Sequence, residues 1–370
     1  MPGWQVILIA SALVCAVSGA LAALLVFAER FLVRYGRCLI DINRGHKRLT
    51  AQGGRTLLAT LMEEGIFVPS ACGGRGTCAL CKLKVLQGGG PLAPTEVPLL
   101  KPDEIRDRVR ISCQVKVRND IAIEVPEELF SIRSYRGVVE RILDLTHDIK
   151  ELRIRLVEPE SIRFTPGQYI QLVAPAYEGS PEPVYRAYSM SRPPSDDRAV
   201  ETIIRLVPDG ICTTWVFRHL KEGDEVEFNG PYGQFRLSTT PREMIWIAGG
   251  SGMAPFWSIL RHMQEKNVRR KTMFFFGAVR RNDIFFLDEM RRKEKELEWF
   301  RFVPALSAPA EGGQWDGEHG LITEAVDRLA GDAADKEAYL CGSPGMIDAA
   351  IKVLKAKGMT DDRIFYDKFA

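Results

Sequence analysis

Histidine is scarce in this 370-residue chain, and its eight cysteines are too few for a disulfide scaffold of this size. The five histidines are scattered without metal-ligand spacing, so we expect each to be a surface or core residue. A strong charge of either sign is also lacking, because 50 Lys and Arg nearly balance 48 Asp and Glu. The formal net charge of +2 argues against a broad nucleic-acid-binding surface, and we predict no nucleic-acid partner. The length indicates two or three domains.

Charge is missing altogether from residues 4–28, an apolar run that we interpret as a single transmembrane helix. At about 1.5 Å per residue, a helix of this length crosses a bilayer core of roughly 30 Å. No basic residue precedes Trp4, so a cleaved signal peptide is the poorer interpretation. Arginines and lysines gather after the run, which predicts an inner-membrane protein whose soluble domains face the cytoplasm. The run offers an ion no charged route, so any ion pumping belongs to partners.

Four cysteines form the clearest chemical pattern: Cys72, Cys78, Cys81 and Cys113. The first three lie in a glycine-rich loop with C-x5-C-x2-C spacing, and the fourth follows after 31 intervening residues. Plant-type ferredoxins hold a [2Fe–2S] cluster with a related C-x4-C-x2-C spacing, and glycines let such a loop adopt positive φ angles. Zinc and disulfides are the alternatives, but zinc commonly takes two C-x2-C pairs and this chain has one. We therefore predict that these four thiolates hold a [2Fe–2S] cluster.

Short alternating strands follow the apolar run. Residues 38–43 and 47–52 read as a hairpin, and residues 55–64 have helical character. We predict a transmembrane helix and connector in residues 1–36 and a β-grasp-like [2Fe–2S] ferredoxin domain in residues 37–126.

Strand patterns continue over residues 135–240, where frequent turn residues predict a small antiparallel β-barrel with one short helix at 215–221. From 241 to 370, continuous apolar strands alternate with helical stretches, which predicts a parallel α/β domain. The expected fold class is therefore multidomain, with α+β and α/β parts.

The last domain opens with a strand, a glycine turn and a helix, an arrangement that suits a dinucleotide pyrophosphate. Gly249, Gly250 and Gly252 form the turn, but Pro255 stands where G-x-G-x-x-G has its last glycine. Residues 277–278, at the end of the second strand, include no acid. An ordinary Rossmann NAD fingerprint therefore fits poorly.

Six motifs in a fixed order resemble the ferredoxin–NADP reductase superfamily over about residues 135–370. They are PGQY (166–169), RAYS (186–189), GICTT (210–214), GPYG (230–233), GGSGMAP (249–255) and CGSP (341–344). The resemblance implies a flavin barrel followed by a nicotinamide-binding domain, with FAD and NADH as cofactors.

The resemblance also implies roles for single residues. Arg186 would pair with the FAD pyrophosphate, Tyr188 would stack on the flavin, and Ser189 would bond near its reactive nitrogen. Cys341 would lie beside the nicotinamide and Phe369 would cover the other flavin face, although they can also be read as a buried strand residue and a core plug. Ser189, Cys341 and Phe369 are the predicted catalytic residues. The predicted cofactor-binding residues are Tyr169, Arg186, Ala187, Tyr188, Ser189, Gly210, Cys212, Thr213, Gly249, Gly250, Gly252, Pro255, Cys341, Gly342 and Phe369.

The complete order of parts is similar to the family of F subunits of sodium-translocating NADH:quinone oxidoreductases. The further local matches are SACGGRGTC (70–78), GGGPLAPTE (88–96) and YDKFA (366–370). This resemblance implies an NADH dehydrogenase that passes electrons through FAD and the cluster to other membrane subunits and ultimately to quinone. NADH is expected over NADPH, although Arg280 and Arg281 could hold a 2′-phosphate. Two alternatives stay open: the reductase component of an oxygenase, and an electron-relay subunit without NADH oxidation.

Overall fold

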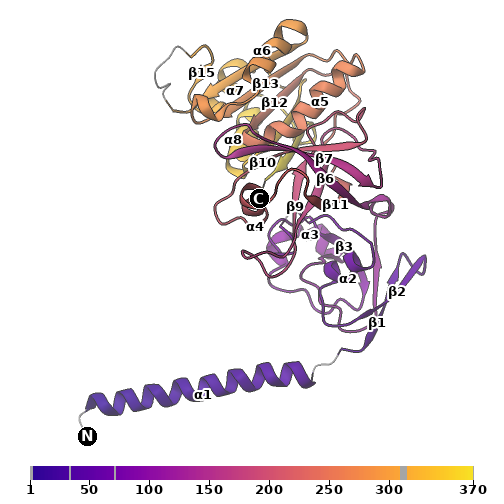
Figure 1. The fold of residues 1–370 in the computed structure, drawn as a ribbon, viewed down its shortest axis with the longest axis vertical. Coiled ribbons are helices and arrows are strands. Elements are labelled where there is room, and N and C mark those ends of the chain that lie inside the picture. The colour runs from indigo at the N-terminus through magenta and orange to yellow at the C-terminus, as the bar shows by residue number, and fades with distance from the viewer. Residues whose placement is uncertain (1–2, 33–34, 71, 309–314, 370) are drawn as a thin grey trace. The chain divides into compact units, whose positions relative to one another are not determined.

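The computed structural model describes residues 3–32, 35–70, 72–308 and 315–369 (Figure 1). The chain divides into two compact units. The first unit contains Met1–Glu64 and Cys81–Pro126, and the second contains Gly65–Leu80 and Glu127–Ala370. The domain borders expected from the sequence stay a prediction.

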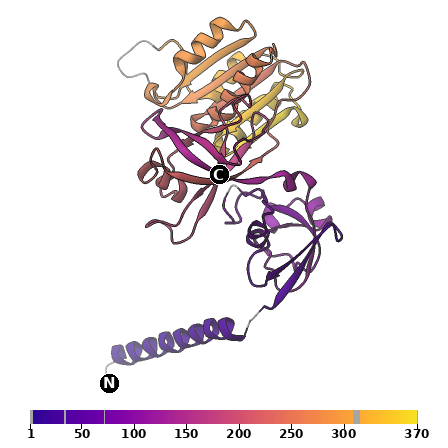
Figure 2. The same ribbon diagram turned by 45° about the vertical axis from the view of Figure 1, so that its right-hand side comes forward.

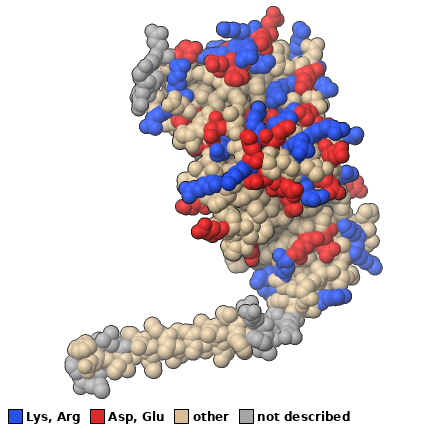
Figure 3. All heavy atoms as spheres, in the orientation of Figure 1, with Lys and Arg blue, Asp and Glu red and all other residues tan. Residues whose placement is uncertain are grey.

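Helix α1 (Gly3–Leu32) covers the apolar run near the N-terminus, so the predicted helix is confirmed. The side chains described along it carry no charge (Figure 3), and large apolar ones such as Leu13 and Val14 are exposed. Among the described residues, no helix meets the combined length and apolarity needed to cross a membrane. The predicted membrane span is therefore not confirmed.

The first unit contains a mixed five-stranded sheet in the order β2-β1-β5-β3-β4. The hairpin is confirmed, since Arg37 in β1 pairs with Gln52 in β2. The Thr56 side chain accepts a hydrogen bond from the Ala59 N–H and caps α2, whose Leu57 packs in the core. The elements are β1 (Arg37–Ile42), β2 (Lys47–Gln52), α2 (Leu57–Glu63), β3 (Lys82–Gln87), η1 (Val97–Leu99), α3 (Pro102–Arg106), β4 (Val109–Ile111) and β5 (Ile121–Glu124).

The second unit begins its regular structure with an antiparallel six-stranded sheet in the order β10-β7-β6-β11-β8-β9. Helix α4 begins directly after Gly210, so the predicted helix at 215–221 starts too late. The elements are η2 (Glu127–Ser131), β6 (Arg133–Asp144), β7 (Ile149–Glu158), β8 (Tyr169–Ala174), β9 (Val184–Ser189), β10 (Ala199–Arg205), α4 (Ile211–Arg218) and β11 (Glu225–Tyr232).

The predicted antiparallel sheet is confirmed, but the predicted barrel is only a half-barrel. Between the edge strands β9 and β10, the described residues form one isolated bridge, from Met190 to Thr202. Pro193 and Pro194 follow almost at once. Proline has no backbone N–H, so a ladder cannot continue through these residues to close the barrel.

The C-terminal part of the second unit is a parallel six-stranded sheet in the order β15-β14-β13-β12-β16-β17, as the alternating pattern predicts (Figures 1 and 2). Its elements are β12 (Met244–Gly249), η3 (Gly250–Gly252), α5 (Met253–Glu265), β13 (Thr272–Ala278), η4 (Arg281–Asp283), α6 (Leu287–Glu296), β14 (Phe300–Leu306), β15 (Glu318–His319), α7 (Ile322–Leu329), β16 (Glu337–Gly342), α8 (Pro344–Ala356), η5 (Asp361–Arg363) and β17 (Ile364–Lys368).

Both faces of this parallel sheet are buried. Trp246 of β12 packs on one face in a core that includes α5 and α6, and Phe256 of α5 joins the same cluster. Ile245 and Ile247 of the same strand pack on the opposite face, in a core that includes α7 and α8. The continuous apolar strands of the sequence therefore reflect a sheet covered on both sides.

A buried ion pair joins the segment between α5 and β13 to the start of β16, and two hydroxyls from the segment between β11 and β12 bind the same carboxylate. Arg270 Nη2 lies 2.6 Å from Glu337 Oε2, and both side chains are almost fully buried. The Ser238 and Thr240 hydroxyls donate to the same carboxylate at 2.6 and 2.7 Å. Burial opposes ionisation of Glu337, but these hydrogen bonds and Arg270 lower its pKa to about 2.

We expect Glu337→Gln to lower the free energy of unfolding at pH 7 by about 3–5 kcal/mol, because Arg270 would be left buried without its counter-charge. The folded-state pKa of Glu337 lies below its ordinary 4.5, so its contribution is complete above that pH and is lost as pH falls toward 2. Urea unfolding at pH 7 and pH 3 measures both effects. The matched control is Glu243→Gln, which removes an exposed pair with Lys271 and should cost below about 1 kcal/mol. Equal losses in both variants would contradict the prediction.

Candidate functional site

A cavity of about 970 Å³ in the second unit brings together most of the predicted cofactor residues. Its walls include the end of β9, the start of α4, the turn after β12, the residues after β16 and the end of β17. The predicted residues that line it are Tyr169, Arg186, Ala187, Tyr188, Ser189, Gly210, Cys212, Thr213, Gly249, Gly250, Gly342 and Phe369. Gly252, Pro255 and Cys341 are buried and stand outside this lining. The cavity therefore unites residues from motifs that lie far apart in the sequence.

Two guanidinium groups on the cavity wall have no carboxylate partner among the described residues. Arg186 comes from β9 and donates to the carbonyl of Tyr185 at 2.7 Å, while Arg75 comes from the glycine-rich loop. Burial lowers the pKa of Arg186, and repulsion from Arg75 lowers it further. Uncompensated cations on a cavity wall suit an anionic group such as a pyrophosphate.

Tyr188 and the start of α4 form the adjoining wall. The Tyr188 hydroxyl and the Cys212 thiol are hydrogen-bonded, and burial raises the pKa of both groups. The Thr213 hydroxyl donates to the Gly210 carbonyl at 3.1 Å, which shapes the turn that begins the helix. The first N–H groups of a helix have no partner within it, so this end of α4 suits a phosphate group.

The turn after β12 shows why glycine is needed at Gly252. A Cβ there would lie 2.2 Å from the Cys341 carbonyl oxygen, which is closer than any real side chain allows. The neighbouring Gly250 has a φ of +56°, in the left-handed region. The turn can therefore pack directly on β16 and keep its backbone open toward the cavity. This close packing also explains why Cys341 is fully buried.

A cation from the antiparallel sheet reaches this glycine turn. Arg205 ends β10, lines the cavity, and donates through Nε to Asp148 Oδ2 at 2.7 Å. Its Nη1 lies 3.5 Å from the position that a Cβ would take on Gly250. Asp148 thus orients a guanidinium beside the turn expected to receive a dinucleotide.

The last strand brings a carboxylate into the cavity. Asp367 lines the wall and pairs in register with Cys341 across β17 and β16. Among the described residues it has no hydrogen-bond or ion-pair partner, and burial raises its pKa to about 6. The Phe369 N–H donates to the Gly342 carbonyl at 2.9 Å, which holds the terminal aromatic residue at the same wall.

The predicted cluster ligands form two close pairs, one in each unit. In the second unit, the hydrogen bond from Cys78 lowers the pKa of Cys72 to about 3 and raises that of Cys78. In the first unit, Cys81 and Cys113 are hydrogen-bonded to each other, which raises the pKa of Cys81. Across the described residues, no three or more His, Cys, Asp or Glu side chains gather closely enough to hold a metal ion. The four-cysteine ligand set therefore stays a prediction.

The cysteine chemistry nevertheless fits an iron–sulfur cluster. All four side chains are free thiols. Gly73, Gly74 and Gly76 have positive φ angles, as the loop interpretation requires. The Gly74 N–H donates to the Ser70 hydroxyl at 3.0 Å, which helps to fix the loop from within its own unit.

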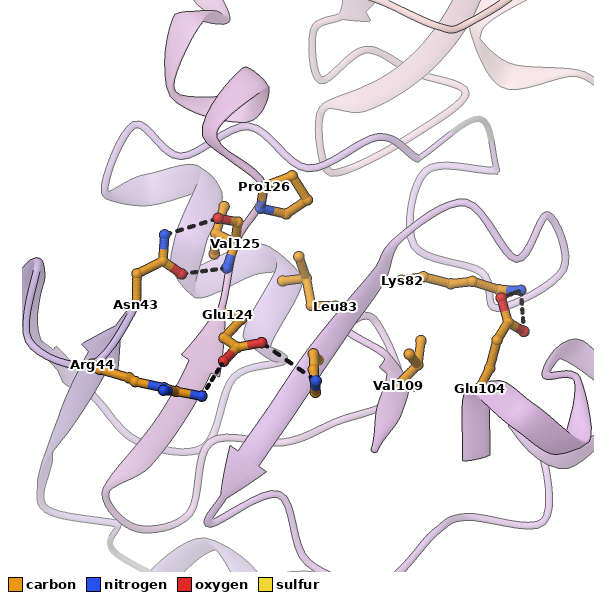
Figure 4. Close-up of a pocket in the computed structure, with 10 residues that line it drawn as sticks. Asn43, Arg44, Lys82, Leu83, Glu104, Val109, Glu124, Val125 and Pro126 are labelled. Atoms are coloured by element: carbon orange, nitrogen blue, oxygen red, sulfur yellow. Dashed lines mark hydrogen bonds and ion pairs between the residues drawn. The ribbon is translucent and has the colours of Figure 1, made fainter. Parts of the chain in front are cut away.

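A second hollow, of about 610 Å³, lies on the first unit and carries no comparable chemistry (Figure 4). Its cations are all neutralised by neighbours. Lys82 Nζ lies 2.7 Å from Glu104, while Arg44 and Lys84 share Glu124 at 3.3 and 3.6 Å. The larger cavity is therefore the candidate site.

Three family models match consecutive parts of the chain. Residues 40–118 match the 2Fe-2S iron-sulfur cluster binding domain, residues 136–237 the oxidoreductase FAD-binding domain, and residues 246–352 the oxidoreductase NAD-binding domain. The predicted cofactors, a [2Fe–2S] cluster, FAD and NADH, are thereby confirmed at the level of domains.

Curated relatives match nearly the whole chain. It is 36% identical to the F subunit of the Na(+)-translocating NADH-quinone reductase of Neisseria meningitidis, over 94% of this chain and 96% of the relative. The F subunit of the same enzyme in Marinomonas sp. is also 36% identical, over 95% of each chain.

Solved structures match in fold. The Amycolatopsis cytochrome P450 reductase GcoB gives a TM-score of 0.72 at 28% identity, covering 90% of this chain and 98% of that one. The ferredoxin reductase in carbazole 1,9a-dioxygenase gives 0.68 at 26% identity, with the same coverage.

Several cavity residues were not predicted from the sequence, among them Arg75, Asp148, Arg205 and Asp367. Arg205 ends a strand five residues before Gly210, so a cation placed just before a phosphate-binding turn was a usable signal. Asp148 lies in a hairpin turn, where acids are common on solvated surfaces. Asp367 sits among charged and aromatic neighbours, and nothing local marks it as buried.

Proposed function

Because the chain belongs to the family of F subunits of the Na(+)-translocating NADH-quinone reductase, we propose that it takes electrons from NADH and delivers them, through FAD and a [2Fe–2S] cluster, toward quinone. One observation carries this proposal. A single cavity is lined both by residues of the FAD-binding domain and by residues of the NAD-binding domain, and the same chain holds the cluster domain.

NADH gives up two electrons together as a hydride, whereas a [2Fe–2S] cluster takes one electron at a time. Bound FAD supplies the chemistry that joins the two, since a flavin accepts a hydride and releases single electrons. The chain contributes the positions of the partners. Cys78, a proposed cluster ligand, lines the cavity together with Tyr169 and Tyr188, which supports a short electron path.

We assign the FAD contacts to the wall formed by β9 and α4. Arg186, with Arg75, would hold the pyrophosphate, and the N–H groups after Gly210 would receive a phosphate oxygen. Tyr188 would stack on the flavin, with Ser189 near its reactive nitrogen. The ligands of the cluster would be Cys72, Cys78, Cys81 and Cys113.

The opposite wall would hold the nicotinamide nucleotide. The turn Gly249–Gly252 would receive its pyrophosphate, with Arg205 beside it. Gly342 would lie beside the nicotinamide ring, and Cys341 would support this wall from behind through its backbone. Phe369 would cover the second face of the flavin. The carboxylate of Asp367 would stabilise the positive charge that the nicotinamide ring gains when it gives up a hydride.

Anaerobic titration of the purified protein tests the electron path. We expect NADH to bleach the flavin absorbance and then to reduce a [2Fe–2S] centre, followed by its paramagnetic signal, with NADPH much less effective. Reduction by NADPH but not by NADH would contradict the respiratory assignment. A protein that binds no flavin, or whose flavin neither nucleotide reduces, would favour the relay alternative.

Arg186→Leu should weaken FAD binding by roughly tenfold or more, because it removes a charge-assisted contact worth about 1.5–3 kcal/mol. Flavin fluorescence during titration of the apoprotein measures this affinity. The control is Arg218→Leu, in the last turn of α4 and outside the cavity lining, which should leave the affinity unchanged. Equal FAD affinity in the Arg186 variant and the wild type would contradict the proposal that Arg186 binds the FAD pyrophosphate.

Asp367→Asn should stabilise the apoprotein at pH 7.5 by about 2–3 kcal/mol while slowing flavin reduction by NADH. The folded-state pKa of about 6 exceeds the ordinary 3.8, so this carboxyl favours folding below pH 3.8 and loses that contribution as pH rises through 6. The variant's advantage should therefore vanish at pH 4. Denaturation at both pH values and stopped-flow reduction are the measurements.

Asp348→Asn is the control for this prediction. Asp348 lies in α8 and is the exposed ion-pair partner of Lys368, the residue that follows Asp367 in β17. This control should change the free energy of unfolding by less than about 1 kcal/mol and should leave the rate of flavin reduction unchanged. A variant at Asp367 that is both more stable and fully active would show that the carboxylate has no redox role.

We further propose that residues 4–28 attach the chain to the inner membrane in a single pass, with the other domains on the cytoplasmic side. The uncharged run and the basic residues after it support this proposal. Membrane attachment would confine electron delivery to other membrane subunits, and thereby to quinone. We expect deletion of residues 1–36 to release the protein from the membrane fraction into the soluble fraction when cells are fractionated.

The oxygenase-reductase alternative has one observation in its favour. The two solved structures above are reductases named for a cytochrome P450 and a dioxygenase, and each covers 90% of this chain. The curated F-subunit relatives share more sequence over slightly more of the chain, so we prefer the quinone-directed function.

A further inference from the structure

A hydrogen-bonded chain in the first unit ends on a cluster cysteine. Gln114 Nε2 donates to the Cys113 sulfur at 3.7 Å. The Thr95 hydroxyl lies 3.0 Å from Gln114 Oε1, where it can only donate, because that amide oxygen is an acceptor. This contact fixes the orientation of the amide and turns its N–H₂ group toward the sulfur. The two bonds therefore form a relay with a defined direction, from Thr95 through Gln114 to Cys113.

The loop that carries Thr95 is held by a buried ion pair. Glu96 is fully buried, and Arg110 Nη2 lies 2.6 Å from its carboxylate. The Arg110 guanidinium also donates to the carbonyls of Gly89, Gly90 and Pro91, at 3.0–3.1 Å. Burial opposes ionisation of Glu96, but Arg110 and two backbone N–H groups keep its pKa below the ordinary value. The position of Thr95 next to Glu96 is thus determined by contacts independent of the cysteines.

We propose that Thr95 and Gln114 raise the reduction potential of the [2Fe–2S] cluster by hydrogen bonding to the Cys113 thiolate. This inference rests on the proposed function, since it presumes that Cys113 is a cluster ligand. Reduction adds negative charge to a cluster and its thiolates, so a donor aimed at a ligand sulfur stabilises the reduced form more than the oxidised form. Gln114 and Thr95 are positioning residues, because neither would bind iron.

The experiment measures the cluster midpoint potential in the full-length protein by redox titration, with the paramagnetic signal as readout. Gln114→Met keeps the shape of the side chain but removes the donor, and Thr95→Val frees the amide to rotate. In Gln114→Met we expect the midpoint potential of the cluster to become more negative. The equilibrium constant for adding one electron should fall several-fold, and a tenfold fall corresponds to 59 mV. Thr95→Val should shift it in the same direction by less.

The matched control is Gln87→Met, the same substitution at an exposed position of β3 in the same unit. It should leave the cluster potential unchanged, and the flavin potential should stay constant in all three variants. If the wild type carries the cluster and both Gln114→Met and Thr95→Val have the same cluster potential as the wild type, this inference is overturned but the proposed function is not. A wild type that binds no [2Fe–2S] cluster would overturn the proposed function and this inference with it.

Discussion

The close approach of two backbones at the carboxyl edge of the parallel sheet is the constraint on which the catalytic unit depends. The glycine turn after β12 packs so tightly on Cys341 that no side chain fits at Gly252. Because the glycines of this turn carry no side chain, its backbone stays open toward the cavity, as a dinucleotide site requires. The same contact fixes the end of β16, against which β17 pairs and Gly342 receives the Phe369 N–H. The C-terminal residues are therefore placed by a contact with a turn that lies far earlier in the chain.

Charge is treated differently inside the cavity and outside it. Away from the cavity, the buried acids Glu337 and Glu96 have full sets of partners that include Arg270 and Arg110 respectively. On the cavity wall, Arg186 faces a like charge and Asp367 has no partner among the described residues. Such groups cost stability in the empty protein, and perturbed pKa values of this kind concentrate at functional sites. The contrast is independent of the comparisons with relatives and leads to the same cavity.

The family relationship and the physical properties of the site support each other at different levels. Matches to relatives and domain models identify which cofactors the chain takes. They do not say which side chains tune those cofactors. The Thr95–Gln114 relay and the Asp148–Arg205 pair come from distances between side chains, and they add proposed electronic and positioning roles to a known architecture.

The cluster domain, the hairpin and the parallel sheet could be predicted from the sequence alone, because cysteine spacing and hydrophobic period are local features. The resemblance of six motifs to a known family added the flavin and nicotinamide domains and some of the residues that line the cavity. Other properties arise only in the folded chain. The barrel stays half open because Pro193 and Pro194, soon after the bridge from Met190 to Thr202, have no N–H with which to continue the pairing. Cys341 is buried because the glycine turn after β12 covers it. Asp367 gains its raised pKa, and Gln114 its fixed orientation, only from neighbours brought together by folding. Burial and partner geometry are non-local quantities, so no local pattern encodes them.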